Sequence, residues 1–218
     1  MDDRIQLLIA HQLAYSYLSR VFYEPPSREL IDTLASDDLF DAFPLETSQP
    51  EAETGLALLR GFSTGWTGDG IEALQQDYRS LFVGPGHLLA APWESVYLTA
   101  DHVLFGPQTL QVRRDFQRFG MAIPHLSIEP DDHLGLELRF IAHLCEVGLQ
   151  ALDSNQPEQV TPLLSEIRRF LSQHLLKWAP ECLSLVIENA RSDYYRGCAH
   201  LTLGCLAHTS EVIQLVTT

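Results

Sequence analysis

The chain has 218 residues, 45% of them hydrophobic, so it can bury a sizeable core without help from metals or disulfides. Its formal net charge of −15 disfavours nucleic acids and anionic lipids as partners and favours cationic ones. The four cysteines lie in apolar segments without metal-ligand or redox-motif spacing, so we expect buried thiols in a reducing compartment: Cys145, Cys182, Cys198 and Cys205.

The first segment places apolar residues three and four apart, the pattern of an amphipathic helix, and this pattern ends at Pro25. It lacks the small-residue cleavage site of a secretory signal, and no apolar run reaches the roughly 18 residues that a membrane span needs. We therefore expect a cytoplasmic protein without stable membrane insertion. Ser27 is placed to cap a second helix, and a third should end near Gly65.

Apolar spacing predicts a further helix over 71–82, which ends at Gly84-Pro85-Gly86. We interpret these glycines and the proline as a turn rather than as a ligand-binding loop. From there to about residue 108 the pattern is irregular, and only residues 96–98 resemble a strand. A connection this long is usually functional or disordered, and its aromatic residues argue against disorder.

The second half repeats the helical pattern after a helix that ends at Gly120. The polar, proline-containing stretch 121–130 is expected to be a hinge between an N-terminal subdomain, 1–120, and a C-terminal subdomain, 131–218. Asp131 or Asp132 should cap the next helix, and Ser192 should open the last one. The absence of an alternating strand series predicts an all-α helical bundle in two subdomains.

The common enzyme motifs do not occur in the sequence. A phosphate-binding loop needs a lysine at the start of a helix after a glycine-rich turn, but the only lysine, Lys177, is followed by Trp-Ala-Pro. There is no nucleophile elbow and no dinucleotide fingerprint. We therefore expect neither catalysis nor a cofactor.

One group of residues leaves an enzyme alternative open. His133 and Glu137 are four residues apart, so they share a helix face, and Asp132 is adjacent to them. Such a set could serve a metal-dependent hydrolase. The competing interpretation is that Asp132 caps the helix while His133 hydrogen-bonds at the hinge, and it is favoured because further ligands at metal spacing are missing.

Aromatic residues gather around the irregular segment, and their role is open at this point. They could form the floor of a peptide groove or pack between helices, and spacing favours neither alternative. The set consists of Tyr78, Phe82, Trp93, Tyr97 and Phe105.

Three motifs around these aromatics resemble a known family. In order they are Tyr78-x-x-Leu81-Phe82-x-Gly84-Pro85, Ala91-Pro92-Trp93-Glu94-Ser95-Val96-Tyr97 and Glu129-Pro130-Asp131-Asp132-His133-Leu134. Their order and spacing resemble the TorD/DmsD/NarJ family of redox-enzyme maturation chaperones, and in particular its DmsD and TorD branches. The resemblance covers essentially the whole chain.

This resemblance implies a cytoplasmic chaperone for a molybdoenzyme of the dimethyl sulfoxide reductase type. Such chaperones bind the twin-arginine signal peptide of the precursor and delay its export until the molybdopterin cofactor is inserted. The family also includes domain-swapped homodimers, and the hinge at 121–130 is where an exchange would occur.

The family's peptide site carries over to this chain by position. Apolar and shape contacts are implied for Tyr78, Leu81, Phe82, Pro85, Pro92, Trp93, Ser95 and Tyr97, and polar contacts for Glu129, Asp132 and His133. A twin-arginine leader presents two guanidinium groups beside an apolar stretch, so carboxylates for forked hydrogen bonds and an apolar trough suit it. Family members often carry tryptophan where this chain has Tyr78.

Overall fold

The computed structural model describes residues 3–36, 39–46, 48–85, 88–99, 101, 104–121 and 130–216. The described residues are mostly helical, and their only bridge between extended segments is an isolated one joining Trp93 and His133. The predicted all-α class is therefore confirmed. The contacts divide the chain into two compact units, and each unit gathers segments that are far apart in the sequence.

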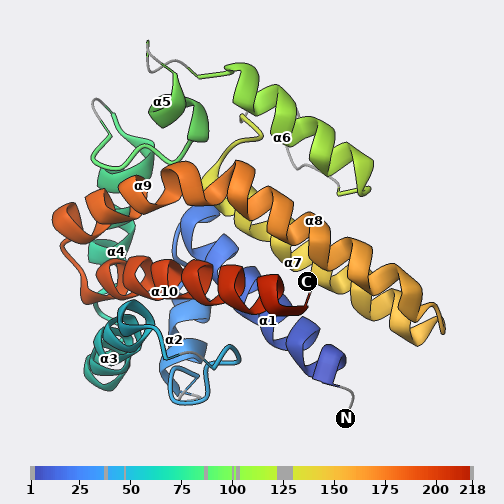
Figure 1. Ribbon diagram of the computed structural model, residues 1–218. Helices are drawn as coiled ribbons and strands as arrows, with labels where there is room; N and C mark the ends of the chain where they lie inside the picture. Colours follow the sequence, from blue (N-terminus) through green and yellow to red (C-terminus); the bar gives the residue numbers. More distant parts are fainter. Residues whose placement is uncertain are drawn as a thin grey trace. The chain divides into compact units, whose positions relative to one another are not determined.

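The first unit comprises Met1–Tyr23, Pro92–Ala179 and Thr209–Thr218. Its helices are α1 (Asp3–Tyr23), α5 (Glu94–Leu98), α6 (Pro107–Arg118), α7 (Leu134–Asp153) and α8 (Val160–Gln173), with a short 3-10 turn at Pro157–Gln159. Helices α1 and α7 run side by side (Figure 1). A Cβ atom at Gly135 of α7 would lie 2.6 Å from the Cβ atom of Tyr23 and 2.9 Å from the carbonyl oxygen of Ser19. Only glycine therefore permits this close approach of α1 to the start of α7.

The second unit comprises Glu24–Ala91 and Pro180–His208. It contains α2 (Arg28–Ser36), α3 (Pro50–Gly65), α4 (Ile71–Tyr78) and a π-helical turn at Arg79–Val83. The backbone of α3 approaches that of α10 (Asp193–Val216) closely, because a Cβ atom at Gly55 would collide with the backbone of Leu201.

Two helices pass from one unit into the other along the chain. Helix α9 (Leu175–Asn189) enters the second unit at Pro180, where the missing N–H removes one hydrogen bond of the helix. Helix α10 (Asp193–Val216) returns to the first unit at Thr209, whose hydroxyl group accepts a hydrogen bond from Tyr15 at 2.8 Å.

The local predictions are confirmed at several helix ends and wrong at two places. Ser27 and Ser192 cap α2 and α10 as expected, with side-chain oxygens 3.2 and 3.3 Å from backbone N–H nitrogens. Residues 96–98, expected to resemble a strand, belong to α5. The cap of α7 is His133 rather than Asp131 or Asp132, because the imidazole accepts from the N–H of Gly135.

Each packing unit contains segments from both halves of the chain, because α1 packs on α7 and α3 packs on α10. The subdomains 1–120 and 131–218 remain a prediction. Residues 122–129 of the predicted hinge lie outside the described residues, so the hinge remains a prediction. All four cysteines are buried, as expected. Within the part of the chain that the structure describes, no helix combines the length and apolar character needed to cross a membrane.

Candidate functional site

The first motif forms an aromatic group in the second unit. The rings of Tyr78 and Phe82 lie 5.3 Å apart, and both contact the ring of Tyr195 in α10, at 6.2 and 5.9 Å. These rings and Leu81 are almost wholly buried, whereas Pro85 is exposed. We call Tyr78, Leu81, Phe82 and Tyr195 the Tyr78 group. Its packing shows that the first motif contributes largely to the core of this unit.

A π-helical turn places Leu81 and Phe82 in this group. The N–H of Gly84 donates to the carbonyl oxygen of Arg79 at 2.9 Å, and the N–H of Ala90 donates back to that of Leu81 at 3.1 Å. Gly84 has a φ of 92°, a backbone conformation that favours glycine. Single π-helical turns within helices often occur at functional sites.

A carboxylate next to the Tyr78 group joins α4 to α10. Asp77 is buried, and its Oδ2 atom accepts hydrogen bonds from the backbone N–H groups of Arg191 and Ser192, at 3.1 and 2.9 Å, and from the Ser192 hydroxyl at 2.7 Å. Negative charge at a helix N-terminus is stabilising, so Asp77 fixes the start of α10 against α4.

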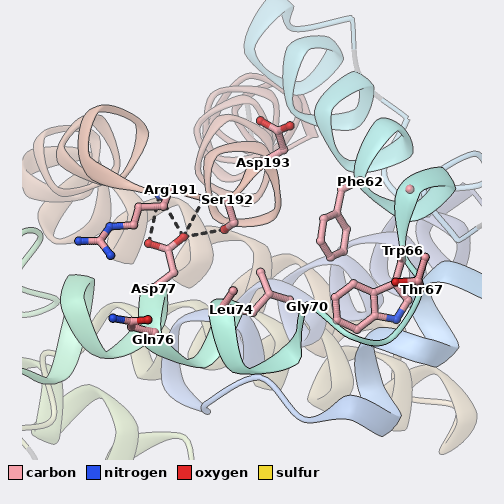
Figure 2. Close-up of a pocket in the computed structure, with 12 residues that line it drawn as sticks. Phe62, Trp66, Thr67, Gly70, Leu74, Gln76, Asp77, Arg191, Ser192 and Asp193 are labelled. Atoms are coloured by element: carbon pink, nitrogen blue, oxygen red, sulfur yellow. Dashed lines mark hydrogen bonds between the residues drawn. The ribbon is translucent and has the colours of Figure 1, made fainter.

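A pocket of about 420 Å³ lies beside Asp77 in the second unit. Figure 2 shows Phe62 and Trp66 on one side of it and the Asp77 carboxylate on the other, while the guanidinium group of Arg191 lies away from the two rings. The indole N–H of Trp66 donates to Asp32 at 2.7 Å, which fixes the indole ring. Because Asp77 already binds the start of α10, the pocket offers mainly an apolar wall to a ligand.

The second and third motifs meet in the first unit. The N–H of Leu134 donates to the carbonyl oxygen of Pro92 at 2.7 Å, and the N–H of Glu94 donates to that of Asp132 at 2.9 Å. The Trp93 and His133 rings meet edge to face with centroids 5.9 Å apart. We call Pro92–Tyr97 with Asp132 and His133 the Trp93 group.

The buried carboxylate of Asp132 fixes this group through hydrogen bonds. It is fully buried, and its Oδ2 atom accepts from the N–H of Ser95, in the first turn of α5, at 2.7 Å. Its Oδ1 atom accepts from the hydroxyl group of Thr109 in α6 at 2.7 Å. This geometry differs from the expected role of Asp132 as a carboxylate presented to a guanidinium group. It gives Asp132 the role of positioning α5 and α6.

His133 is a neutral residue in this arrangement. Burial lowers the pKa of His133 to about 3, and its Nδ1 atom accepts from the N–H of Gly135 at 3.0 Å. The proton of the neutral ring is therefore assigned to Nε2. The ring also meets that of Tyr23 edge to face at 5.2 Å. The partly exposed members of the Trp93 group are Trp93, Val96 and Tyr97.

The predicted site residues thus fall into two sets. Tyr78, Leu81, Phe82 and Pro85 lie in the second unit, and Pro92, Trp93, Ser95, Tyr97, Asp132 and His133 lie in the first. The structure brings the members of the Trp93 group together around α5. Glu129 lies outside the described residues, and the shared trough remains a prediction.

Sequence reasoning missed a set of buried ionisable residues behind α5. Glu94 and His174 are both buried, and the Nδ1 atom of His174 lies 2.8 Å from Oε2 of Glu94. The other ring nitrogen of His174 lies 3.6 Å from a carboxylate oxygen of Asp115 in α6. Glu94 and His174 are 80 positions apart in the sequence, which explains why no sequence motif contains both. The sequence signalled Glu94 only by its position inside the second motif, and Glu137 only as a candidate of the hydrolase alternative.

Glu137 completes this set, which we call the buried acid cluster: the buried Glu94, Glu137 and His174 together with the partly exposed Asp115. Glu137 is fully buried on α7, and its Oε2 atom accepts from the indole N–H of Trp178 at 3.2 Å. Burial, then the negative charges of Glu94 and Asp132, raise the pKa of Glu137 well above its usual value. These effects favour the protonated, neutral form of Glu137.

The arrangement does not support the metal-dependent hydrolase alternative. Asp132 and His133 accept hydrogen bonds from the backbone, and Glu137 accepts one from Trp178. Among the described residues, no group of histidine, cysteine or acidic side chains could hold a metal ion.

Comparisons with known proteins agree with the three motifs. A model of the nitrate reductase delta subunit family matches residues 46–184. The Tat proofreading chaperone DmsD of Salmonella typhi is 31% identical over 189 residues, which cover 85% of this chain and 81% of the relative.

Two other relatives match a shorter part. The probable Tat proofreading chaperone DmsD of Haemophilus influenzae is 35% identical over 133 residues, or 61% of this chain and 58% of the relative. The chaperone protein TorD of Vibrio cholerae is 32% identical over 144 residues, or 65% of this chain and 62% of the relative.

Proposed function

Because the chain belongs to the nitrate reductase delta subunit family, which includes the TorD and DmsD chaperones, we propose that it is a cytoplasmic, non-catalytic chaperone for a molybdoenzyme precursor. It binds the twin-arginine signal peptide of an enzyme of the dimethyl sulfoxide reductase type and delays export until the cofactor is inserted. The observation that carries this proposal is the convergence of the second and third motifs on Trp93 and His133.

The exposed part of the Trp93 group suits such a peptide. Trp93 and Tyr97 are partly exposed aromatic residues, and Leu98 next to them is an exposed apolar residue. Tryptophan rings bind apolar side chains and also guanidinium groups through their faces. The net charge of −15 attracts a basic leader over a distance that salt shortens to about 8 Å at physiological ionic strength.

The remaining site residues have different roles in this proposal. Pro85 in the second unit is exposed and can contact a ligand directly, while Tyr78 and Phe82 support it from the core. In the first unit, Asp132 and His133 position α5 and present Trp93. Glu129 is proposed, from its place in the third motif, as a carboxylate for the leader's guanidinium groups.

Calorimetric titration with twin-arginine leader peptides of molybdoenzymes tests the proposal. We expect binding that weakens by roughly tenfold or more in Trp93→Ala, since a central tryptophan usually carries much of an interface's binding energy. A peptide with both arginines replaced by lysine should bind less tightly, because lysine cannot make forked hydrogen bonds.

Trp66→Ala is a matched control because Trp66 is also a partly exposed tryptophan but lies outside the predicted site. It should bind the leader like the wild type. If no leader binds at high micromolar concentration, the proposed function is wrong. If Trp66→Ala and Trp93→Ala lose equal affinity, the function stands and the assignment of the site is wrong.

A further inference from the structure

We propose that one buried proton, shared between the side chains of Glu137 and Glu94, positions the Pro92–Tyr97 segment, so that alkaline solution loosens this segment and weakens peptide binding. This inference rests on the proposed function only for its statement about the peptide. The proton and its effect on the segment are properties of the free chain.

The hydrogen bonding around Glu137 indicates that its carboxyl group carries a proton. Its Oε2 atom accepts from Trp178, but its Oε1 atom is buried and has no donor partner among the residues that the structure describes. The side chain is also within hydrogen-bonding reach of Glu94, another acidic group. Two buried carboxylates cannot donate to each other, whereas a protonated Glu137 donates its O–H to Glu94. A single proton thus satisfies the orphaned oxygen and removes a like-charge repulsion.

The other side of Glu94 carries the compensating positive charge. Burial by itself lowers the pKa of His174, but hydrogen bonds with Asp115 and Glu94 outweigh it and raise the pKa above its usual value. Glu94 therefore lies between a proton donor on α7 and an imidazolium at the end of α8. Arg169 in turn pairs with Asp115 at 2.7 Å.

Two routes connect Glu137 to the proposed peptide-binding segment. The first passes directly through Glu94, the residue that follows Trp93 and opens α5. The second passes through Trp178, which donates to Glu137 and packs on the ring of Tyr97 with centroids 5.5 Å apart. Both ends of the segment therefore depend on the protonation of one side chain. Glu137 is a positioning residue in this proposal, because it lies beneath the segment.

The charged groups around Glu137 fix the direction of the pH dependence. Besides Glu137 and His174, the charged and titratable groups in and around the buried acid cluster are Glu94 from α5, Asp115 from α6, Asp132 and His133 just before α7, and Arg169 from α8. The pKa of Glu137 is higher in the folded than in the unfolded chain. Its contribution to stability is therefore fully present below about pH 4.5 and is lost as the pH rises through its folded value.

His174 acts in the same direction, because its folded pKa is also raised. Its contribution is fully present below about pH 6.5 and is lost as the pH rises through the folded value. At alkaline pH the released protons leave two facing carboxylates and a neutral imidazole. The Pro92–Tyr97 segment, which these groups held in place while they were protonated, then loosens.

Glu137→Gln tests the proposal because the glutamine amide is a permanent neutral donor of nearly the same shape. The melting temperature of the wild type should fall as the pH rises above about 4.5, and its leader affinity should fall as the pH rises through the folded pKa values of Glu137 and His174. Each titrating proton can change the affinity by at most about tenfold per pH unit. Glu137→Gln should fold and bind the leader peptide at neutral pH as the wild type does. Its stability and affinity should retain only the weaker pH dependence that His174 contributes.

Glu146→Gln is the matched control, since Glu146 is an exposed residue on the same helix. It should keep the wild-type pH profile. Infrared spectroscopy gives a readout independent of peptide: the wild type should show the carbonyl band of a buried, protonated carboxylic acid at neutral pH, and Glu137→Gln should lack it.

The outcomes separate this proposal from the proposed function. If the acid band and the pH-dependent melting appear but no leader binds at any pH, the shared proton stands and the function fails. If leaders bind but Glu137→Gln keeps the full wild-type pH profile, or does not fold at neutral pH, the shared proton is overturned.

Discussion

The Trp93 group and the Tyr78 group are held in place by different forces. The Trp93 group rests on buried ionisable side chains: Asp132 caps α5, and Glu94 lies between Glu137 and His174. The Tyr78 group rests on three packed aromatic rings. Burial of charge depends on complete pairing and on pH, whereas aromatic packing depends on neither. We therefore expect the stability of the Trp93 group to depend on pH and that of the Tyr78 group not to.

The largest effect is expected from Asp132→Ala in the Trp93 group. The substitution removes both acceptors of a fully buried carboxylate and leaves the Ser95 N–H and the Thr109 hydroxyl unpaired. We expect a loss of roughly 3–5 kcal/mol in the free energy of unfolding, measured by urea denaturation. Asp132→Asn retains one acceptor and should lose less. Equal losses in the two variants would show that the hydrogen bonds do not hold α5.

Phe82→Ala tests the other side of the comparison. It removes a buried ring of the Tyr78 group and should lower the free energy of unfolding by about 3 kcal/mol. Because no titratable group is lost, the difference from the wild type should be the same at mildly acidic and mildly alkaline pH. A loss that changes with pH would contradict the distinction between the two groups.

A smaller, acid-dependent effect is expected at His133. Its folded pKa of about 3 lies below the ordinary 6.5, so its contribution to stability is full above pH 6.5 and is lost as the pH falls toward 3. His133→Asn keeps a capping side chain but cannot titrate.

As the pH falls from 6.5 to 5, the free energy of unfolding of His133→Asn should rise by about 2 kcal/mol relative to that of the wild type. Urea denaturation at each pH measures this difference. The contribution of Glu137 to stability has the opposite pH dependence, but it is common to both proteins and cancels in this difference. A difference that stays constant with pH would mean that His133 is not buried as a neutral ring.

The comparisons confirm the family that the three motifs resemble, and the structure confirms the helical class. Both follow from local patterns. Helical periodicity depends on neighbours three and four residues away, and the caps formed by Ser27 and Ser192 depend on the residues that follow directly. The helical class and the two caps could be predicted from the sequence because their physical causes lie within one or two helical turns.

Tertiary packing decided the rest. Residues 96–98 became helical because Asp132, more than thirty residues later, caps α5, and His133 rather than an aspartate caps α7 because both aspartates are engaged elsewhere. The pairing of Glu94 with His174 spans 80 residues. Burial and charge pairing depend on which distant segments come together. Spacing along the sequence therefore predicts the members of the proposed site, but not which of them are exposed and which lie buried beneath the others.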